Sequence, residues 1–393
     1  MAANQKQKNE NRTASVLKLA ALAVLLIVLI FAAAGIIAGT SFADTDTDTV
    51  LSADSADVIY AADAESVADL RAYENGAVLL TADDVLYPEA SGNVTRSAAH
   101  SYSQPCMTSF DRKVLVYDRG NKNYRLEINA AVFGTYEAPG AILTATVGKK
   151  GNYAVATVAD GGFQSKLYVY KEDGSLQYEW GSARNFITAI ALSDSGKRIA
   201  VALVGSENAV YTSRVTVFEV GLTEPLYTFT YDNTTVVQLD FMRNDTIGIV
   251  TDTFVSYICD GQEDVKLTYP ADSLLSADTQ HAKRTAVLVA GGYSEESGVR
   301  VYEWDNDGDL KLDVLVADGA YMMSLTDRYV AVADEKMISV YDRSGKLHGQ
   351  AQSLYTIHRI ALTGTNVFCQ HESGINAYSV HNRLPAEKSD ALG

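Results

Sequence analysis

The chain has 393 residues, of which 47% are hydrophobic and 21% charged, and its formal net charge is −17. That length allows one large domain or two ordinary domains with a sizeable core. The acidic balance repels phosphate backbones and anionic lipid, so the sequence predicts neither non-specific nucleic-acid binding nor a protein that lies flat on a membrane. The three cysteines fit neither complete disulfide pairing nor a zinc-binding spacing.

An apolar segment near the N-terminus predicts a transmembrane helix. Residues 1–18 form a basic tail, and no charged residue occurs from Leu19 to Ala43. A run of that length can span a hydrocarbon core, and we place the helix at residues 19–39 as a signal anchor. Basic residues before the span and Asp44 after it predict a cytoplasmic N-terminus and a C-terminal domain outside.

A cleaved signal peptide is the alternative for this segment. Its apolar stretch exceeds the usual signal core, which favours the uncleaved anchor. In both cases the bulk of the chain is expected outside the cytoplasmic membrane. Residues 40–57 are acidic and small, as in a solvated spacer. Residues 58–382 are expected to form the folded domain, and residues 383–393 a polar C-terminal tail.

A repeated strand pattern predicts the fold. Alternating apolar residues that end in an aromatic or leucine recur along the chain at Tyr87, Leu126, Tyr170, Phe218, Tyr257, Tyr302, Tyr341 and Tyr378. The steps between them are roughly 37 to 48 residues, the period of a four-stranded propeller blade. Two further short apolar runs, bounded by Gly, Asp and Asn, precede each copy and read as strands. The sequence therefore predicts an all-β propeller of about eight four-stranded blades, with seven as the alternative count.

The last unit lacks a fourth strand after Tyr378, whereas the segment 57–61 (DVIYA) is a strand with no unit of its own. We expect this segment to supply the missing outer strand and so to cover the open sheet edge. Two separate β-sandwiches are the alternative architecture. They would require a linker, and no Pro/Ser-rich or charged linker occurs between residues 60 and 382.

The unit ITAIALSDSGKRIAVALVG at residues 187–205 resembles repeats of WD-like and TolB-like propellers, in which a Ser-Asp-Gly turn joins the two inner strands. The basic tail, single span, acidic spacer and eight units together resemble an uncharacterised family of membrane-anchored propellers of Gram-positive bacteria, a domain of unknown function. The resemblance covers nearly the whole chain. Its motifs are structural, so it implies a fold and leaves the activity open, because propellers serve as enzymes, scaffolds and sensors.

The motifs of common catalytic sites are missing from the sequence. It contains no GxSxG elbow and no HExxH, and the stretch Ser195–Arg198 lacks the glycine and hydroxyl of a phosphate-binding loop. Asp305-Asn306-Asp307-Gly308-Asp309 offers alternating oxygen ligands of the kind that calcium prefers. Gly-containing turns occupy the same place in other units, which favours a hairpin turn. We therefore expect no catalytic residues, no metal and no cofactor.

Polar residues on the predicted innermost strands are the remaining candidate site. Innermost strands line the axis of a propeller, where polar side chains can bind a ligand or pair with one another. These candidates are Arg71, Asp240, Asp278, His358 and Arg359. The favoured function is a non-catalytic, membrane-anchored scaffold that binds an envelope or membrane protein outside the cell, with the lipid bilayer contacted through the N-terminal helix. The alternative is an extracytoplasmic enzyme, or a ligand or glycan sensor, that uses the mouth of the channel.

Overall fold

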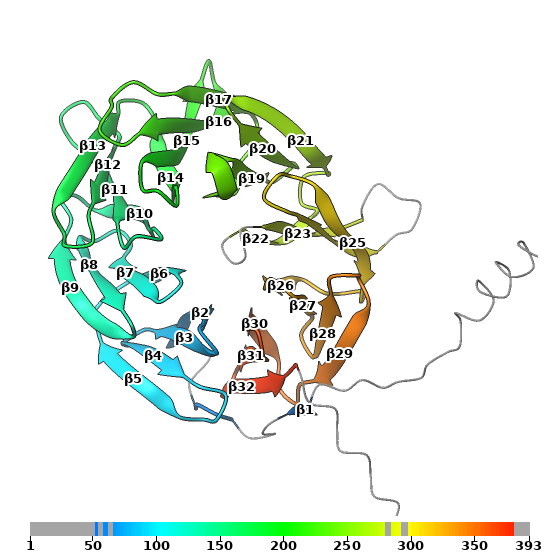
Figure 1. The fold of residues 1–393 in the computed structure, drawn as a ribbon. Helices are drawn as coiled ribbons and strands as arrows, with labels where there is room; N and C mark the ends of the chain where they lie inside the picture. The colour runs from blue at the N-terminus through cyan, green and yellow to red at the C-terminus, as the bar shows by residue number, and fades with distance from the viewer. Residues whose placement is uncertain (1–51, 54–57, 62–65, 280–283, 292–297, 381–393) are drawn as a thin grey trace, which may run out of the picture. The chain divides into compact units, whose positions relative to one another are not determined.

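The computed structural model describes residues 52–53, 58–61, 66–279, 284–291 and 298–380. These residues form eight four-stranded antiparallel sheets arranged as blades around an axis (Figure 1). The prediction of an all-β propeller with four-stranded blades is confirmed, and the number of blades is eight. The two-sandwich alternative is thereby excluded.

The predicted transmembrane helix at 19–39, the basic tail before it and the polar tail at 383–393 lie outside the described residues, as does most of the spacer. Within the part that the structure describes, none of the helical segments has the length and apolar character needed to cross a membrane.

Blades 1 to 4 each use four consecutive strands, numbered from the axis outward. Blade 1 contains β2 (Val67–Tyr73), β3 (Gly76–Thr81), β4 (Asp84–Pro88) and β5 (Val94–Ala99). Blade 2 contains β6 (Pro105–Phe110), β7 (Lys113–Asp118), β8 (Asn123–Ile128) and β9 (Ala131–Glu137). Blade 3 contains β10 (Ile142–Val147), β11 (Tyr153–Val158), β12 (Ser165–Tyr170) and β13 (Leu176–Ser182). Blade 4 contains β14 (Phe186–Leu192), β15 (Arg198–Glu207), β16 (Val210–Glu219) and β17 (Tyr227–Asp232).

Blades 5 to 7 repeat this order. Blade 5 contains β18 (Val236–Phe241), the 3-10 turn η2 (Arg243–Asp245), β19 (Ile247–Thr251), β20 (Phe254–Cys259) and β21 (Gln262–Thr268). Blade 6 contains β22 (Leu274–Asp278), β23 (Thr285–Ala290), β24 (Val299–Trp304) and β25 (Leu310–Val316). Blade 7 contains β26 (Met322–Leu325), β27 (Tyr329–Ala333), β28 (Met337–Asp342) and β29 (Leu347–Gln352).

Blade 8 joins the two ends of the folded chain. Its inner strands are β30 (Ile357–Leu362), β31 (Asn366–His371) and β32 (Gly374–Ser379), and its outer strand is the short β1 (Ser52–Ala53). Tyr60 adds an isolated antiparallel bridge to Ile375 further along β32. The expected closure by an N-terminal segment is therefore present, and its pairing starts at Ser52, ahead of the segment 57–61 that was expected to provide it.

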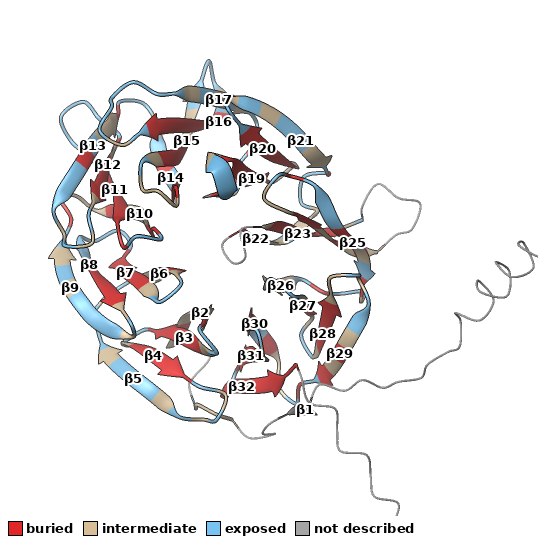
Figure 2. Cartoon of the chain, in the orientation of Figure 1, coloured by how far each residue is buried: buried red, intermediate tan, exposed pale blue. Residues whose placement is uncertain are grey.

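Strand position within a blade explains the sequence pattern. The second strands, such as β19 (IGIVT) and β23 (TAVLVA), are almost wholly buried and read as continuous apolar runs. Both faces of these strands pack against neighbouring blades, so neither face needs polar residues. The outer strand β17 (YTFTYD) instead alternates between half-buried and exposed residues, because only one of its faces is covered. Figure 2 shows this gradient from buried middle strands to exposed outer strands.

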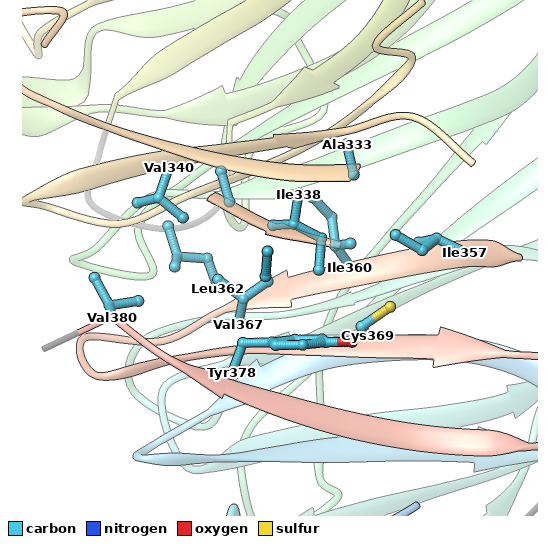
Figure 3. Packing of buried hydrophobic residues seen from close by; sticks show 12 residues of the cluster. Ala333, Ile338, Val340, Ile357, Ile360, Leu362, Val367, Cys369, Tyr378 and Val380 are labelled. Atoms are coloured by element: carbon cyan, nitrogen blue, oxygen red, sulfur yellow. The ribbon is translucent and has the colours of Figure 1, made fainter. Parts of the chain in front are cut away.

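Packing between blades forms the core. Ile338 and Val340 of blade 7 lie against Ile360, Leu362 and other residues of blade 8, all of them buried (Figure 3). The eight recurring positions predicted from the sequence all lie on the third strand of a blade. All are buried except Tyr170 and Tyr302, which are half-buried. The aromatic at this position therefore serves packing between blades.

Candidate functional site

The two faces of the propeller carry different connections. The top face, as defined here, contains the links from one blade to the next and the turns between second and third strands. The bottom face contains the turns between first and second strands and between third and fourth strands. Each inner strand begins at the top face and runs toward the bottom face, because the four strands of a blade alternate in direction.

The five polar residues singled out in the sequence all lie on inner strands, but they do not form one cluster. Arg71 on β2 forms an ion pair of 2.9 Å with Asp69 on the same strand. Burial disfavours the charged form of Arg71, and the carboxylates of Asp69 and Asp278 outweigh this and raise its pKa. Asp278 on β22 therefore acts electrostatically on Arg71 of blade 1.

Asp240 and Asp278 lie on the neighbouring inner strands of blades 5 and 6. Burial raises the pKa of Asp240 to about 8, and the charge of Asp278 adds to the shift, although a hydrogen bond of 2.8 Å from the Phe241 amide opposes it. Asp278 accepts a hydrogen bond of 3.1 Å from the Leu325 amide of blade 7. Both carboxylates therefore accept backbone hydrogen bonds that organise the inner strands.

His358 and Arg359 face different surroundings. Arg359 is half-buried and donates a hydrogen bond of 3.2 Å to Gln370 of its own blade. His358 is exposed at a bulge near the top face. Across the described residues, no three His, Cys, Asp or Glu side chains come together in a geometry that could hold a metal ion.

The candidate calcium loop folds as a hairpin turn. The Asp305 carboxylate accepts hydrogen bonds of 3.0 Å from the Asp307 amide and 3.1 Å from the Asp309 amide. The ammonium group of Lys311 lies 3.0 Å from Asp305 and 3.3 Å from Asp309. Two carboxylates are thus paired with a lysine where a cation would have to bind. Asp342 forms the same turn with the Ser344 and Lys346 amides.

Among the described residues, the two larger crevices of the bottom face lie in blades 1 to 4. One, of about 490 Å³, lies between the turns of blades 1 and 2 and is lined by Tyr73, Glu74 and Arg112 among others. Glu74 and Arg112 form an ion pair there. The other, of about 460 Å³, lies among turns of blades 3 and 4 near Phe133 and Asn152. Ser91 and Glu89 line the first crevice, and the Ser91 hydroxyl donates a hydrogen bond of 3.3 Å to the Glu89 carboxylate. Both side chains are exposed, and within the part of the chain that the structure describes, neither crevice is lined by a histidine that could act as a general base.

The top face carries exposed apolar side chains in consecutive blades, which we call the apolar arc. Its members lie at or just before the start of the inner strands of blades 4 to 8: Phe186, Val237, Leu275, Tyr321 and Leu354. Their exposed fractions range from 36% for Leu275 to 79% for Leu354. These side chains gain little from burial when the chain folds, and exposed apolar surface that a partner can cover marks interaction sites.

Neighbouring blades in the apolar arc are tied together. Gln238 of blade 5 donates a hydrogen bond of 3.1 Å to the Ala277 carbonyl of blade 6. The Tyr321 hydroxyl of blade 7 donates one of 3.4 Å to the Ile357 carbonyl of blade 8. Blade 5 is thus tied to blade 6, and blade 7 to blade 8, where they present the arc, as a rigid binding surface requires.

β-bulges explain two of these exposed positions. The register shifts between Val236 and Gln238 in β18, and between Leu274 and Ser276 in β22. Val237 and Leu275 are therefore the extra residues, which lie outside the ladder and are exposed, whereas Val236 before the first is buried and Leu274 before the second is half-buried. The alternation of apolar and polar residues along a strand could not alone predict that Val237 and Leu275 are exposed. The local signals were the pairs Val236-Val237 and Leu274-Leu275 at the start of an inner strand.

Comparison with solved structures supports the fold. The chain is similar to BamB from Moraxella catarrhalis, with 12% identity, a TM-score of 0.51, and 84% of this chain and 100% of that chain covered. It is similar to the C-terminal WD40 domain of Sif2, with 11% identity, a TM-score of 0.59, and coverages of 86% and 99%. It is also similar to Saccharomyces cerevisiae Sqt1, with 9% identity, a TM-score of 0.57, and coverages of 82% and 98%. At these identities the likeness concerns the fold alone.

The sequence itself matches no curated protein. A family model does match it, over residues 52–375, from the first strand to the second residue of the last strand, β32. The chain therefore belongs to the Family of unknown function DUF5711.

Proposed function

We propose that this protein is a non-catalytic scaffold that binds another protein through the top face of its propeller, held at the outer side of the cytoplasmic membrane by its N-terminal apolar segment. The observation that carries the proposal is the apolar arc. An exposed set of Phe, Val, Leu and Tyr side chains in five consecutive blades has the composition of a protein-binding surface.

The chemistry around the axis fits a scaffold better than an enzyme. Arg71, Asp240, Asp278 and Arg359 each have an intramolecular partner on the inner strands or beside them. Polar groups that form hydrogen bonds or ion pairs with one another stabilise the ring of blades, whereas catalysis requires groups that are directed at a substrate. The N-terminal anchor remains a proposal from the sequence, since a span of that length and charge asymmetry would place the propeller outside.

The test compares two triple variants of the full-length protein in its native membrane. Phe186→Ser, Leu275→Ser and Leu354→Ser together remove most of the apolar arc. The matched control is Leu176→Ser, Leu310→Ser and Leu347→Ser, which changes three exposed leucines that begin outer strands next to the bottom face. Tagged proteins are purified after gentle solubilisation, and co-purifying proteins are quantified.

The proposal predicts a stoichiometric partner that is lost from the arc variant and retained by the wild type and the control variant. Circular dichroism and melting temperature must match between the two variants, so that loss of the partner is not loss of fold. A partner that stays with the arc variant would contradict the proposal.

A further inference from the structure

Acidic side chains occur in the top-face connections around the part of the apolar arc that lies in blades 6 to 8. Asp272 precedes Leu275 by three residues, and Asp318 precedes Tyr321 by three residues, in the links that enter blades 6 and 7. Both carboxylates are exposed. Each of these two apolar residues thus lies at the entry to its blade, close in the chain to an exposed acidic residue.

The same arrangement occurs around Leu354, the most exposed member of the arc. The exposed Glu335 lies against the end of the link that contains Leu354, since its carbonyl accepts a hydrogen bond of 2.8 Å from the Ile357 amide. The exposed Glu372 also lies beside it, because its carboxylate accepts a hydrogen bond of 2.9 Å from the Thr356 amide. Four exposed acids therefore flank the arc.

Basic residues are fewer in this sector of the top face. Among the described residues of the top-face connections of blades 4 to 8, the exposed basic side chains are Arg184 and Lys336. Lys336 donates a hydrogen bond of 3.3 Å to Thr356. A partner that brings carboxylates to this surface would meet repulsion, whereas one that brings Lys or Arg would find complementary charge.

On the basis of the proposed function, we infer that the occupant of the apolar arc is a protein segment in which apolar side chains alternate with Lys and Arg residues. The apolar side chains cover the arc, and the ammonium or guanidinium groups reach the acidic rim formed by Asp272, Asp318, Glu335 and Glu372. Charges at the rim act mainly through association rate and specificity and are screened by salt. Binding should therefore require apolar side chains in the partner segment, and its affinity should fall strongly as the ionic strength rises.

Three labelled peptides of about nine residues serve as probes. They separate the need for apolar side chains in the partner from the need for basic side chains. The first contains three Leu and three Lys, the second three Leu and three Glu, and the third three Ser and three Lys, each in a Gly/Ser background. The full-length protein is placed in nanodiscs of zwitterionic lipid, and fluorescence anisotropy is read against empty nanodiscs. Peptide affinity is measured from about 50 to about 500 mM NaCl.

The inference predicts that the Leu/Lys peptide binds at least about tenfold more tightly than either other peptide at low salt, and that the difference shrinks at high salt. The rim variant carries Asp272→Asn, Asp318→Asn and Glu335→Gln. Its control carries Glu224→Gln, Asp260→Asn and Asp307→Asn. These changes neutralise exposed acids in bottom-face turns and reduce the net negative charge by the same amount as the rim variant. The rim variant should weaken Leu/Lys binding by about fivefold or more, and the control should not.

Equal affinity for the Leu/Lys and Leu/Glu peptides would overturn the inference. Equal weakening by the rim variant and its control would also overturn it, because binding would then report net charge alone. The two proposals fail separately. If the native partner is lost from the arc variant but binds the rim variant normally at low and high salt, the scaffold function stands and the basic character of the partner is wrong.

Discussion

Tyr87 on blade 1 donates a hydrogen bond of 2.6 Å to the buried carboxylate of Glu127 on blade 2. Glu127 also forms an ion pair of 2.6 Å with the buried Arg125. Arg125 in turn donates hydrogen bonds to the Ala98 and Ala99 carbonyls of blade 1. Burial and the charge of Glu127 raise the pKa of Tyr87, so its hydroxyl remains a donor throughout the ordinary pH range. This network fastens the first two blades.

Replacing Tyr87 with Phe should therefore destabilise the ring. The Glu127 oxygen that accepts this hydrogen bond would lose its donor while staying buried, which costs about 1–3 kcal/mol. The expected result is a lower midpoint of urea unfolding for the full-length protein. Tyr211→Phe is the control, because its exposed hydroxyl makes a contact of 3.3 Å with Thr235 that water can replace. Equal midpoints for Tyr87→Phe and the wild type would contradict this role.

Closure of the ring depends on Gly374. A Cβ atom there would lie 2.0 Å from the Tyr60 carbonyl oxygen, and the backbone φ angle is +141°. Gly374→Ala should thus separate the N-terminal segment from β32 and speed hydrogen exchange of the amides at residues 58–61. Gly364→Ala in the same blade is the matched control, since a Cβ atom at Gly364 meets nothing within 4 Å. Unchanged exchange in Gly374→Ala would show that the closure tolerates a side chain there.

The stability contribution of Asp240 should depend on pH. Its pKa of about 8 in the folded chain lies above its value in the unfolded chain, so the folded state binds the proton more tightly. The favourable contribution is complete below about pH 4 and is lost as the pH rises through about 8. Asp240→Asn imitates the protonated form, so its melting temperature should rise relative to the wild type between about pH 5 and about pH 9.

Asp318→Asn provides the comparison for that pH series. The Asp318 carboxylate is exposed, so the melting temperature of the Asp318→Asn variant should follow that of the wild type across the same pH range. A constant difference between Asp240→Asn and the wild type at all pH values would show that the Asp240 carboxylate stays ionised in the fold.

The period of the strand pattern carried most of the information about the fold. Each of the eight repeated positions, from Tyr87 to Tyr378, lies on a third strand. The reason is that each blade uses a similar number of residues, so equivalent positions recur at a regular spacing in the sequence. The closing strand was harder to place. β1 has only two residues, Ser52 and Ala53, and a bridge at Tyr60 resumes the pairing, so no continuous strand pattern marks it.

The candidate site could be predicted less well from the sequence than the fold could. The five polar residues singled out in the sequence lie on inner strands, but pairs such as Arg71 with Asp69 became visible only in three dimensions. The apolar arc was missed altogether. Val237 and Leu275 look like core residues in a strand pattern, and only the bulges in their strands leave them exposed.

Photo-crosslinking in the native membrane tests the central claim most directly. A photoreactive phenylalanine analogue is introduced singly at Leu275 and Tyr321 in the apolar arc, and at Leu310 and Leu347 near the bottom face, all of which are exposed. The scaffold account predicts one discrete protein adduct of the same mass from both arc positions and none from the other two. Adducts from the bottom-face positions alone, or from all four positions equally, would contradict it.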